Sequence, residues 1–141
     1  MIRAHFTDNE TGWVEPVGDR TAIVLGVPWT TDRFGYKDRV ALVPSVGCTC
    51  KNCRIPQVAD VVERSGMNRY VITLVRRKQK NIRRVVDAIR LLDPLSRHSA
   101  LQESWEIRVA TRLQRQTLAA FLRVALPFRV NVLDFYPGKV G

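Results

Sequence analysis

The chain has 141 residues, of which 45% are hydrophobic and 26% charged, with 8 glycines and 7 prolines that show no repeat. This profile is typical of a globular protein, and it excludes disordered, collagen-like and coiled-coil chains. A chain of this length buries about 68–70% of its unfolded surface, so it can fold without a disulfide or a metal. We therefore expect a single compact domain over residues 1–141.

The net charge of +10 is distributed unevenly along the chain. Residues 1–65 carry eight basic and eight acidic side chains, whereas residues 66–141 carry fifteen basic and five acidic ones. The whole positive excess therefore lies in the second half. Such an asymmetry indicates an anionic partner, of which nucleic acid is the commonest. An acidic protein, a membrane surface and an ordinary charged surface are the alternatives.

The start of the chain indicates where the protein works. Residues 1–8 turn polar before the hydrophobic region of a signal peptide can form. No run approaches 18 apolar residues, so we expect a cytoplasmic protein without a membrane partner. The cysteines should then be reduced.

The first half alternates short apolar segments with turn residues, which predicts strands. We expect these strands at residues 2–6, 12–17, 21–25, 40–43, 58–63 and 69–75, with a hairpin turn at Gly18-Asp19-Arg20. The last two strands should form an antiparallel hairpin through Ser65-Gly66-Met67-Asn68, because Gly and Asn accept a positive φ. The β-rich half thus covers residues 1–75.

After residue 76 the hydrophobic period changes from two residues to about 3.6. This pattern predicts a helix at 81–92, a strand at 105–110, and a second helix at 112–126 after a capping box formed by Thr111 and Gln114. A last strand follows at 130–135. We therefore predict an α+β fold, in which an antiparallel β-rich half packs on a βαβαβ half over residues 76–141 with both helices on one sheet face.

Several segments of the first half match the pattern of one known family. They are Trp13-Val-Glu15, Val27-Pro28-Trp29, Tyr36-Lys37-Asp38-Arg39-Val40 and Ser65-Gly66. The chain resembles the bacterial domain-of-unknown-function family numbered four-two-six-five, loosely over most of its length and best over residues 12–75. Lys37 and Met67 stand where that family has Gly and His. Because the family has no assigned activity, the resemblance implies the two-part layout and no catalytic residue.

The segment from Gly47 to Arg54 looks like an insertion relative to that family, and it contains three cysteines. Cys48, Cys50 and Cys53 could bind one zinc ion, because a Cys-x-x-Cys turn directs its sulfurs toward one point. A histidine, His5 or His98, or a partner chain would have to supply the fourth ligand. The alternative is a surface loop with three reduced thiols, and zinc is the single cofactor that the sequence suggests.

Catalytic signatures are missing from the sequence. It has no phosphate-binding Gly loop, no Gly-x-Ser-x-Gly frame and no His-Glu-x-x-His motif. His5 lies on a predicted strand and His98 in a polar loop after Pro94, so both are more simply surface residues than general bases. We name no catalytic residue and no small-molecule substrate, and an enzyme of unidentified class ranks third among the possible functions.

A basic cluster at the start of the first predicted helix is the strongest functional candidate. Together with two arginines from the polar stripe of the second helix, the candidate residues are Arg76, Arg77, Lys78, Lys80, Arg83, Arg84, Arg112 and Arg115. A cation near a helix N-terminus opposes the helix macrodipole by about 0.3–1 kcal/mol. The accumulation of several basic residues at this helix start favours a phosphate-binding site. The alternative is a solvated face in which Arg83 and Arg84 pair with Asp87.

The sequence therefore favours a non-catalytic, basic binding module for an anionic partner. Nucleic acid is the first hypothesis, since the cations cluster beside a helix start. Its contacts would be made through the phosphate backbone, because the aromatic strand motif of RNA-reading sheets is absent, an absence that also favours the alternative. The alternative is an adaptor or inhibitor that docks an acidic protein surface in a phage, defence-system or immunity context.

Overall fold

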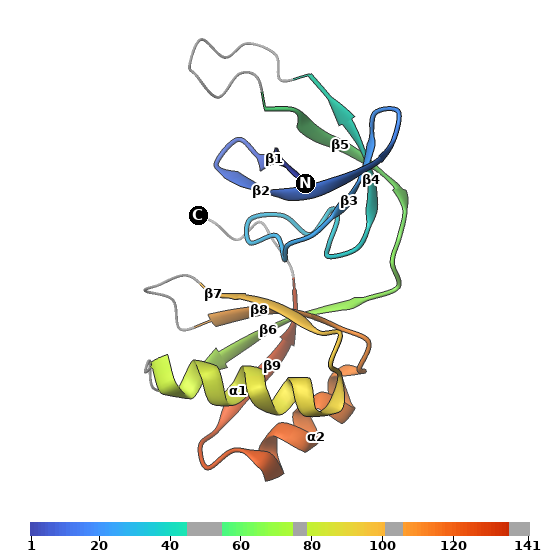
Figure 1. The fold of residues 1–141 in the computed structure, drawn as a ribbon. Coiled ribbons are helices and arrows are strands. Elements are labelled where there is room, and N and C mark those ends of the chain that lie inside the picture. Colours follow the sequence, from blue (N-terminus) through green and yellow to red (C-terminus); the bar gives the residue numbers. More distant parts are fainter. Residues whose placement is uncertain (45–54, 75–78, 101–105, 136–141) are drawn as a thin grey trace. The chain divides into compact units, whose positions relative to one another are not determined.

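A computed structural model describes residues 1–44, 55–74, 79–100 and 106–135 of the chain. The described residues form two units, which cover residues 1–65 and 66–135 (Figure 1). The predicted α+β class is confirmed, with strands in the first unit and a sheet with two helices in the second. The division falls after Ser65 rather than at residue 75, because the strand at 68–74 pairs only with strands of the second unit.

The first unit is a small closed barrel. Its strands are β1 (Ile2–Thr7), β2 (Glu10–Gly18), β3 (Thr21–Val24), β4 (Arg39–Val43) and β5 (Gln57–Glu63). Consecutive strands pair antiparallel, and a parallel pairing of β1 with β5 at His5 and Gln57 closes the barrel. The predicted turn between β2 and β3 is confirmed, and Arg20 in it has a φ of 57°.

Alternating side chains of these strands fill the barrel, as the period of two predicts. The buried strand residues are Ala4, Phe6, Val14, Ala22, Val24, Val40 and Val58, and Phe34 from the connection between β3 and β4 joins them. The rings of Phe6 and Phe34 meet edge to face with centroids 5.3 Å apart. Gly12 leaves room for this packing, because a Cβ at Gly12 would overlap the Phe6 ring.

The second unit contains four strands and two helices among its described residues. They are β6 (Asn68–Leu74), α1 (Gln79–Leu92), β7 (Arg97–Ala100), β8 (Glu106–Thr111), α2 (Arg115–Ala125) and β9 (Val130–Asp134). The sheet order is β7-β8-β6-β9, and all neighbouring strands are antiparallel. This βαββαβ order with split βαβ units is the ferredoxin-like arrangement.

Both helices pack on one face of this sheet, as predicted (Figure 1). Tyr70, Ile72 and Leu74 of β6 point toward the helices together with Ile107 and Val109 of β8. The helices contribute Val85, Ala88 and Ile89 from α1 and Leu118 and Leu122 from α2 to the same core. The 3.6-residue stripes found in the sequence are therefore the faces that the helices bury.

Strand β7 is one element that the sequence did not predict. His98 was expected in a polar loop, but it pairs with Val109 of β8 on this outer strand. Three of the four β7 residues are exposed, so their side chains carry no alternating hydrophobic signal. The second half therefore has one strand more than the predicted βαβαβ order.

The predicted hairpin between residues 58–63 and 69–75 is wrong. β5 pairs with β1 and β4, whereas β6 pairs with β8 and β9. The two strands belong to different hydrophobic cores, since Val58 is buried in the barrel and Tyr70 in the second unit. Gly66 does take the expected positive φ, 78°, but in the connection between the units.

The predicted capping box is also wrong. Helix α2 begins at Arg115 after Gln114, and its N-cap makes no side-chain hydrogen bond. The Thr111 hydroxyl instead donates to Asp93 Oδ2 at 2.8 Å.

Candidate anion-binding site

Helix α1 holds the described part of the predicted basic cluster. Lys80, Arg83 and Arg84 lie in its first two turns, whereas Arg76, Arg77 and Lys78 lie outside the described residues. The apolar stripe of α1 faces the core, so the basic residues between its members are exposed. The first turn of α1 contains no acidic residue. The helix therefore forms because its apolar face is buried, despite unfavourable cations at its N-terminus.

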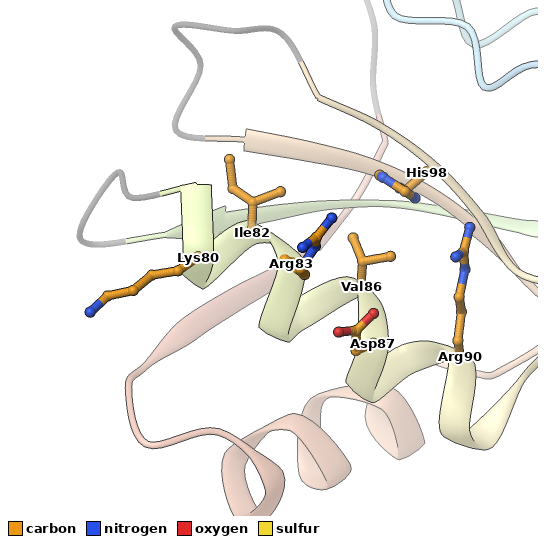
Figure 2. A pocket seen from close by; sticks show the side chains of 7 residues that line it. All are labelled: Lys80, Ile82, Arg83, Val86, Asp87, Arg90 and His98. Carbon is orange, nitrogen blue, oxygen red and sulfur yellow. The ribbon is translucent and has the colours of Figure 1, made fainter.

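A cleft of about 590 Å³ lies between α1 and the outer strand β7, and we call it the α1–β7 cleft (Figure 2). Its lining residues are Lys80, Ile82, Arg83, Val86, Asp87, Arg90 and His98. Figure 2 shows Arg83 and Arg90 extending toward the strand that carries His98, while Lys80 extends outward from the first turn. Arg90 follows Arg83 by seven positions, which places them about 10 Å apart along the helix axis.

Among the described residues, the cations of the cleft have no carboxylate partner. In the described part of the chain, no ion pair joins Lys80, Arg83, Arg84 or Arg90 to an acidic side chain. Asp87 is the one acid among the lining residues, and the described structure contains no ion pair between it and Arg83 or Arg84, the pairing that belongs to the alternative of a solvated face. The cleft is therefore a region of net positive charge that is open to an anion.

The pKa of His98 reflects the positive charge around the cleft. His98 is exposed on β7, but partial desolvation of its ring lowers its pKa below the ordinary value, and the neighbouring Arg90 and Arg97 lower this pKa further. Asp87 opposes the shift but does not cancel it. His98 is therefore held in its neutral form near pH 7, and an anion bound beside it would favour its protonation.

Arg84 lies beside the α1–β7 cleft but not in it. It lines a second hollow of about 540 Å³ between α1 and the end of α2, together with Ala88, Leu91 and Pro127. Leu91 is 79% exposed there. Successive residues of a helix point about 100° apart, so Arg83 and Arg84 serve neighbouring surfaces.

The structure does not bring Arg112 and Arg115 to this cleft. Arg112 pairs with Asp93, which follows the last turn of α1, at the opposite end from Lys80. Arg115 forms a surface ion pair with Asp134, with 3.2 Å between Nη1 and Oδ2. Both guanidinium groups already contact a carboxylate within the second unit, so we leave them out of the candidate site.

Asp93 is 1% exposed and joins three segments of the second unit. Its carboxylate accepts hydrogen bonds from the Thr111 hydroxyl, from the Arg112 backbone N–H and guanidinium, and from the Leu95 backbone N–H. Burial alone would raise the pKa of Asp93, but these hydrogen bonds lower it from 3.8 to about 2. Asp93 is therefore a structural residue that fixes the end of α1 against β8.

Sequence reasoning missed Arg90 and His98 as members of the site. The position of Arg90, seven residues after Arg83 on a predicted helix, could have placed it on the same face. No sequence signal could have found His98, because its role depends on the unpredicted pairing of β7 with β8.

The sheet face opposite the helices carries no aromatic side chain on its two central strands. This face presents Arg69, Val71 and Thr73 on β6, with Glu106, Arg108 and Ala110 on β8. RNA-reading sheets of this topology stack bases on aromatic residues at central-strand positions. These strands therefore offer no platform for base stacking.

In the first unit, two segments of the family resemblance meet at Asp38. Its carboxylate accepts backbone N–H bonds from Gly35 and Ser65, each at 2.8 Å, and the Ser65 hydroxyl donates to the Tyr36 carbonyl. Lys37 has a φ of 69°, a conformation that a glycine at that position would adopt freely. Asp38 and Ser65 are thus engaged in holding the backbone.

Among the described residues, no three His, Asp or Glu side chains gather in a way that could hold a metal ion. Cys48, Cys50 and Cys53, the predicted zinc ligands, lie outside those residues. No helix in the described ranges has the length and apolar character needed to cross a membrane.

Comparison of the chain with protein-family models, curated proteins and solved structures finds no match. The resemblance to the family numbered four-two-six-five therefore stays a prediction.

Proposed function

We propose that the second unit is a non-catalytic module that binds the phosphate backbone of nucleic acid in the α1–β7 cleft. The observation that carries this proposal is the group of cations around His98, Lys80, Arg83 and Arg90, which form no ion pair with any carboxylate in the described ranges. Guanidinium groups bind phosphate oxygens bidentately, and paired cations would not be available for this contact.

Two features support backbone binding over base recognition. Three of the five polar side chains that line the cleft are cationic, and the central strands lack a stacking platform. Contacts to phosphates position a nucleic acid but carry no sequence information. The proposed binding is therefore strong at low salt and nearly independent of sequence.

Charge-neutralised variants of the full chain test the proposal. The cleft variant carries Lys80→Gln, Arg83→Gln and Arg90→Gln, and the matched control carries Arg3→Gln, Arg20→Gln and Arg33→Gln in the first unit. Both lose three positive charges. Fluorescence anisotropy with a labelled 20-nucleotide single-stranded RNA should show at least tenfold weaker binding for the cleft variant and less than twofold for the control.

A carboxylate probe separates this proposal from the alternative of an acidic protein partner. Labelled polyglutamate of similar charge should bind at least tenfold more weakly than the RNA if the cleft is specific for a phosphate backbone. Equal affinity for both polymers would favour an adaptor for an acidic protein. Equal losses in the cleft variant and its control would contradict a localised site.

A further inference from the structure

Strand β9 is an outer strand of the second unit's sheet. It pairs with β6 on one side, and no strand of the described chain pairs with its other side. The backbone N–H of Phe135 donates to the Arg69 carbonyl, which lies directly opposite in the same register. Directly opposed residues of an antiparallel ladder alternate between pairs that exchange hydrogen bonds and pairs that do not. Val130, Val132 and Asp134 therefore turn their backbone N–H and C=O groups outward.

A groove of about 730 Å³ runs along this strand between β9 and α2, and we call it the β9 groove. Its floor is apolar, with Ala119 from α2 and Phe128, Val130 and Val132 from the β9 side. Leu133 also lines it and is 52% exposed. Natural outer strands are protected by a bulge, a proline, a lysine or a covering segment. β9 contains no proline or lysine, and its register with β6 is unbroken.

Charge indicates which kind of strand fits here. The polar side chains that line the β9 groove are Arg123, Arg129 and Asn131, and none of the lining residues is acidic. A second copy of this chain would bring the same two arginines and another net charge of +10. Like charges facing each other across a strand pair are destabilising, whereas opposite charges stabilise it. The complementary ligand is therefore acidic.

We propose that the β9 groove binds an extended acidic segment of a partner protein, which adds to the sheet next to β9. Its backbone would pair with the outward groups of Val130, Val132 and Asp134. Every second side chain would enter the apolar groove, and carboxylates would reach Arg123 and Arg129. This is strand addition, in which backbone bonds provide affinity and alternate side chains provide specificity. The site is separate from the α1–β7 cleft and does not depend on it.

A peptide selection provides the probe. A phage-displayed library of random 12-residue peptides is selected against the full chain, and the best peptide is synthesised with a fluorescein label. The selected peptides should alternate apolar residues with Asp or Glu. No enrichment, or enrichment of peptides without carboxylates, would overturn the proposal.

Two protein variants then test the backbone pairing. Asp134→Pro removes an outward N–H without removing a bond to β6, and it should weaken peptide binding at least tenfold. Asp134→Ala is the matched control, because it loses the same carboxylate but keeps the N–H, and it should bind within twofold of the wild type. The double variant Arg123→Gln, Arg129→Gln should also weaken binding at least tenfold. Equal affinity of the two Asp134 variants would contradict strand addition.

A measurement with the wild-type chain covers the case in which Asp134→Pro does not fold. Two versions of the peptide carry N-methyl groups on alternate amides, one on the odd and the other on the even positions. One version should lose binding at least tenfold while the other keeps it. Equal binding of both would overturn the proposal. So would a dimer in sedimentation that the Arg123→Gln, Arg129→Gln variant strengthens, because a second copy would then occupy the groove.

Discussion

Asp93 shows how one buried carboxylate can bind a helix end to a sheet. Its pKa is about 2 in the folded protein against 3.8 for the free side chain, so the folded state favours the ionised form. The resulting stabilisation is complete above about pH 4 and is lost as the pH falls toward 2. A pKa shift of this size corresponds to a contribution of at most roughly 2 kcal/mol to the free energy of unfolding. The electrostatic attraction of Arg112 accounts for less of it, because the Arg112 side chain is exposed to solvent.

We predict that Asp93→Asn lowers the free energy of unfolding by roughly 2 kcal/mol at pH 7, since the amide cannot accept all five hydrogen bonds. Urea unfolding followed by circular dichroism at pH 7 and pH 2.5 measures the effect. The difference between wild type and variant should shrink markedly at the lower pH, where Asp93 is partly protonated. A difference that is the same at both pH values would show that Asp93 acts by packing alone.

The same residue explains why a local sequence pattern failed. Thr111 and Gln114 have the spacing of a capping box, but Thr111 finds its partner in Asp93, eighteen positions earlier in the chain. A hydrogen bond to a buried carboxylate is stronger than one to a solvated helix end, so Thr111 bonds to Asp93 and not to the start of α2. Reasoning from neighbours in sequence cannot detect such a contact.

At the scale of elements, predictability follows the buried hydrophobic pattern. Helix α1 was predicted to within two residues of its start, because its apolar stripe repeats every three or four positions. Strand β7 was missed, because it is defined by backbone pairing with β8 and its side chains are mostly exposed. The basic half of the candidate site was therefore visible in the sequence, whereas the opposite wall with His98 was not.

The proposed binding of an anion in the α1–β7 cleft should depend on pH. Arg83, Asp87 and Arg90 line the cleft with His98, and Arg97 precedes it on its own strand. Partial desolvation, Arg90 and Arg97 lower the pKa of His98, so a bound phosphate should raise this pKa and cause proton uptake. Affinity for the labelled RNA should therefore increase as the pH falls from 7.5 to 5.5 at constant ionic strength.

The variant His98→Gln tests this linkage, since it keeps a polar side chain that does not titrate. Its affinity should change at least threefold less than that of the wild type over the same pH range. Equal pH dependence would exclude His98 as the linked group. The folded state must be monitored in parallel, because a His with a lowered pKa makes folding less favourable as the pH falls below about 6.5.

At the scale of the whole molecule, the two halves differ in charge as much as in architecture. The barrel sequence is balanced, and the positive excess lies in residues 66–141. A uniformly basic surface would attract polyanions through net charge alone, whereas a cleft does so through particular phosphate contacts. The salt dependence of binding distinguishes these two cases, because it counts the phosphates that are neutralised.

We predict a slope of log K against log[salt] of roughly −2 on single-stranded RNA and roughly −3 on duplex DNA, for three contacts by Lys80, Arg83 and Arg90. The cleft variant Lys80→Gln, Arg83→Gln, Arg90→Gln should lower the magnitude of the single-strand slope by about 2, because three contacts are lost. The variant Arg3→Gln, Arg20→Gln, Arg33→Gln should keep the wild-type slope, although it loses the same three positive charges as the cleft variant. Parallel slopes for the two variants would mean that the long-range field of the chain, and not the α1–β7 cleft, holds the nucleic acid.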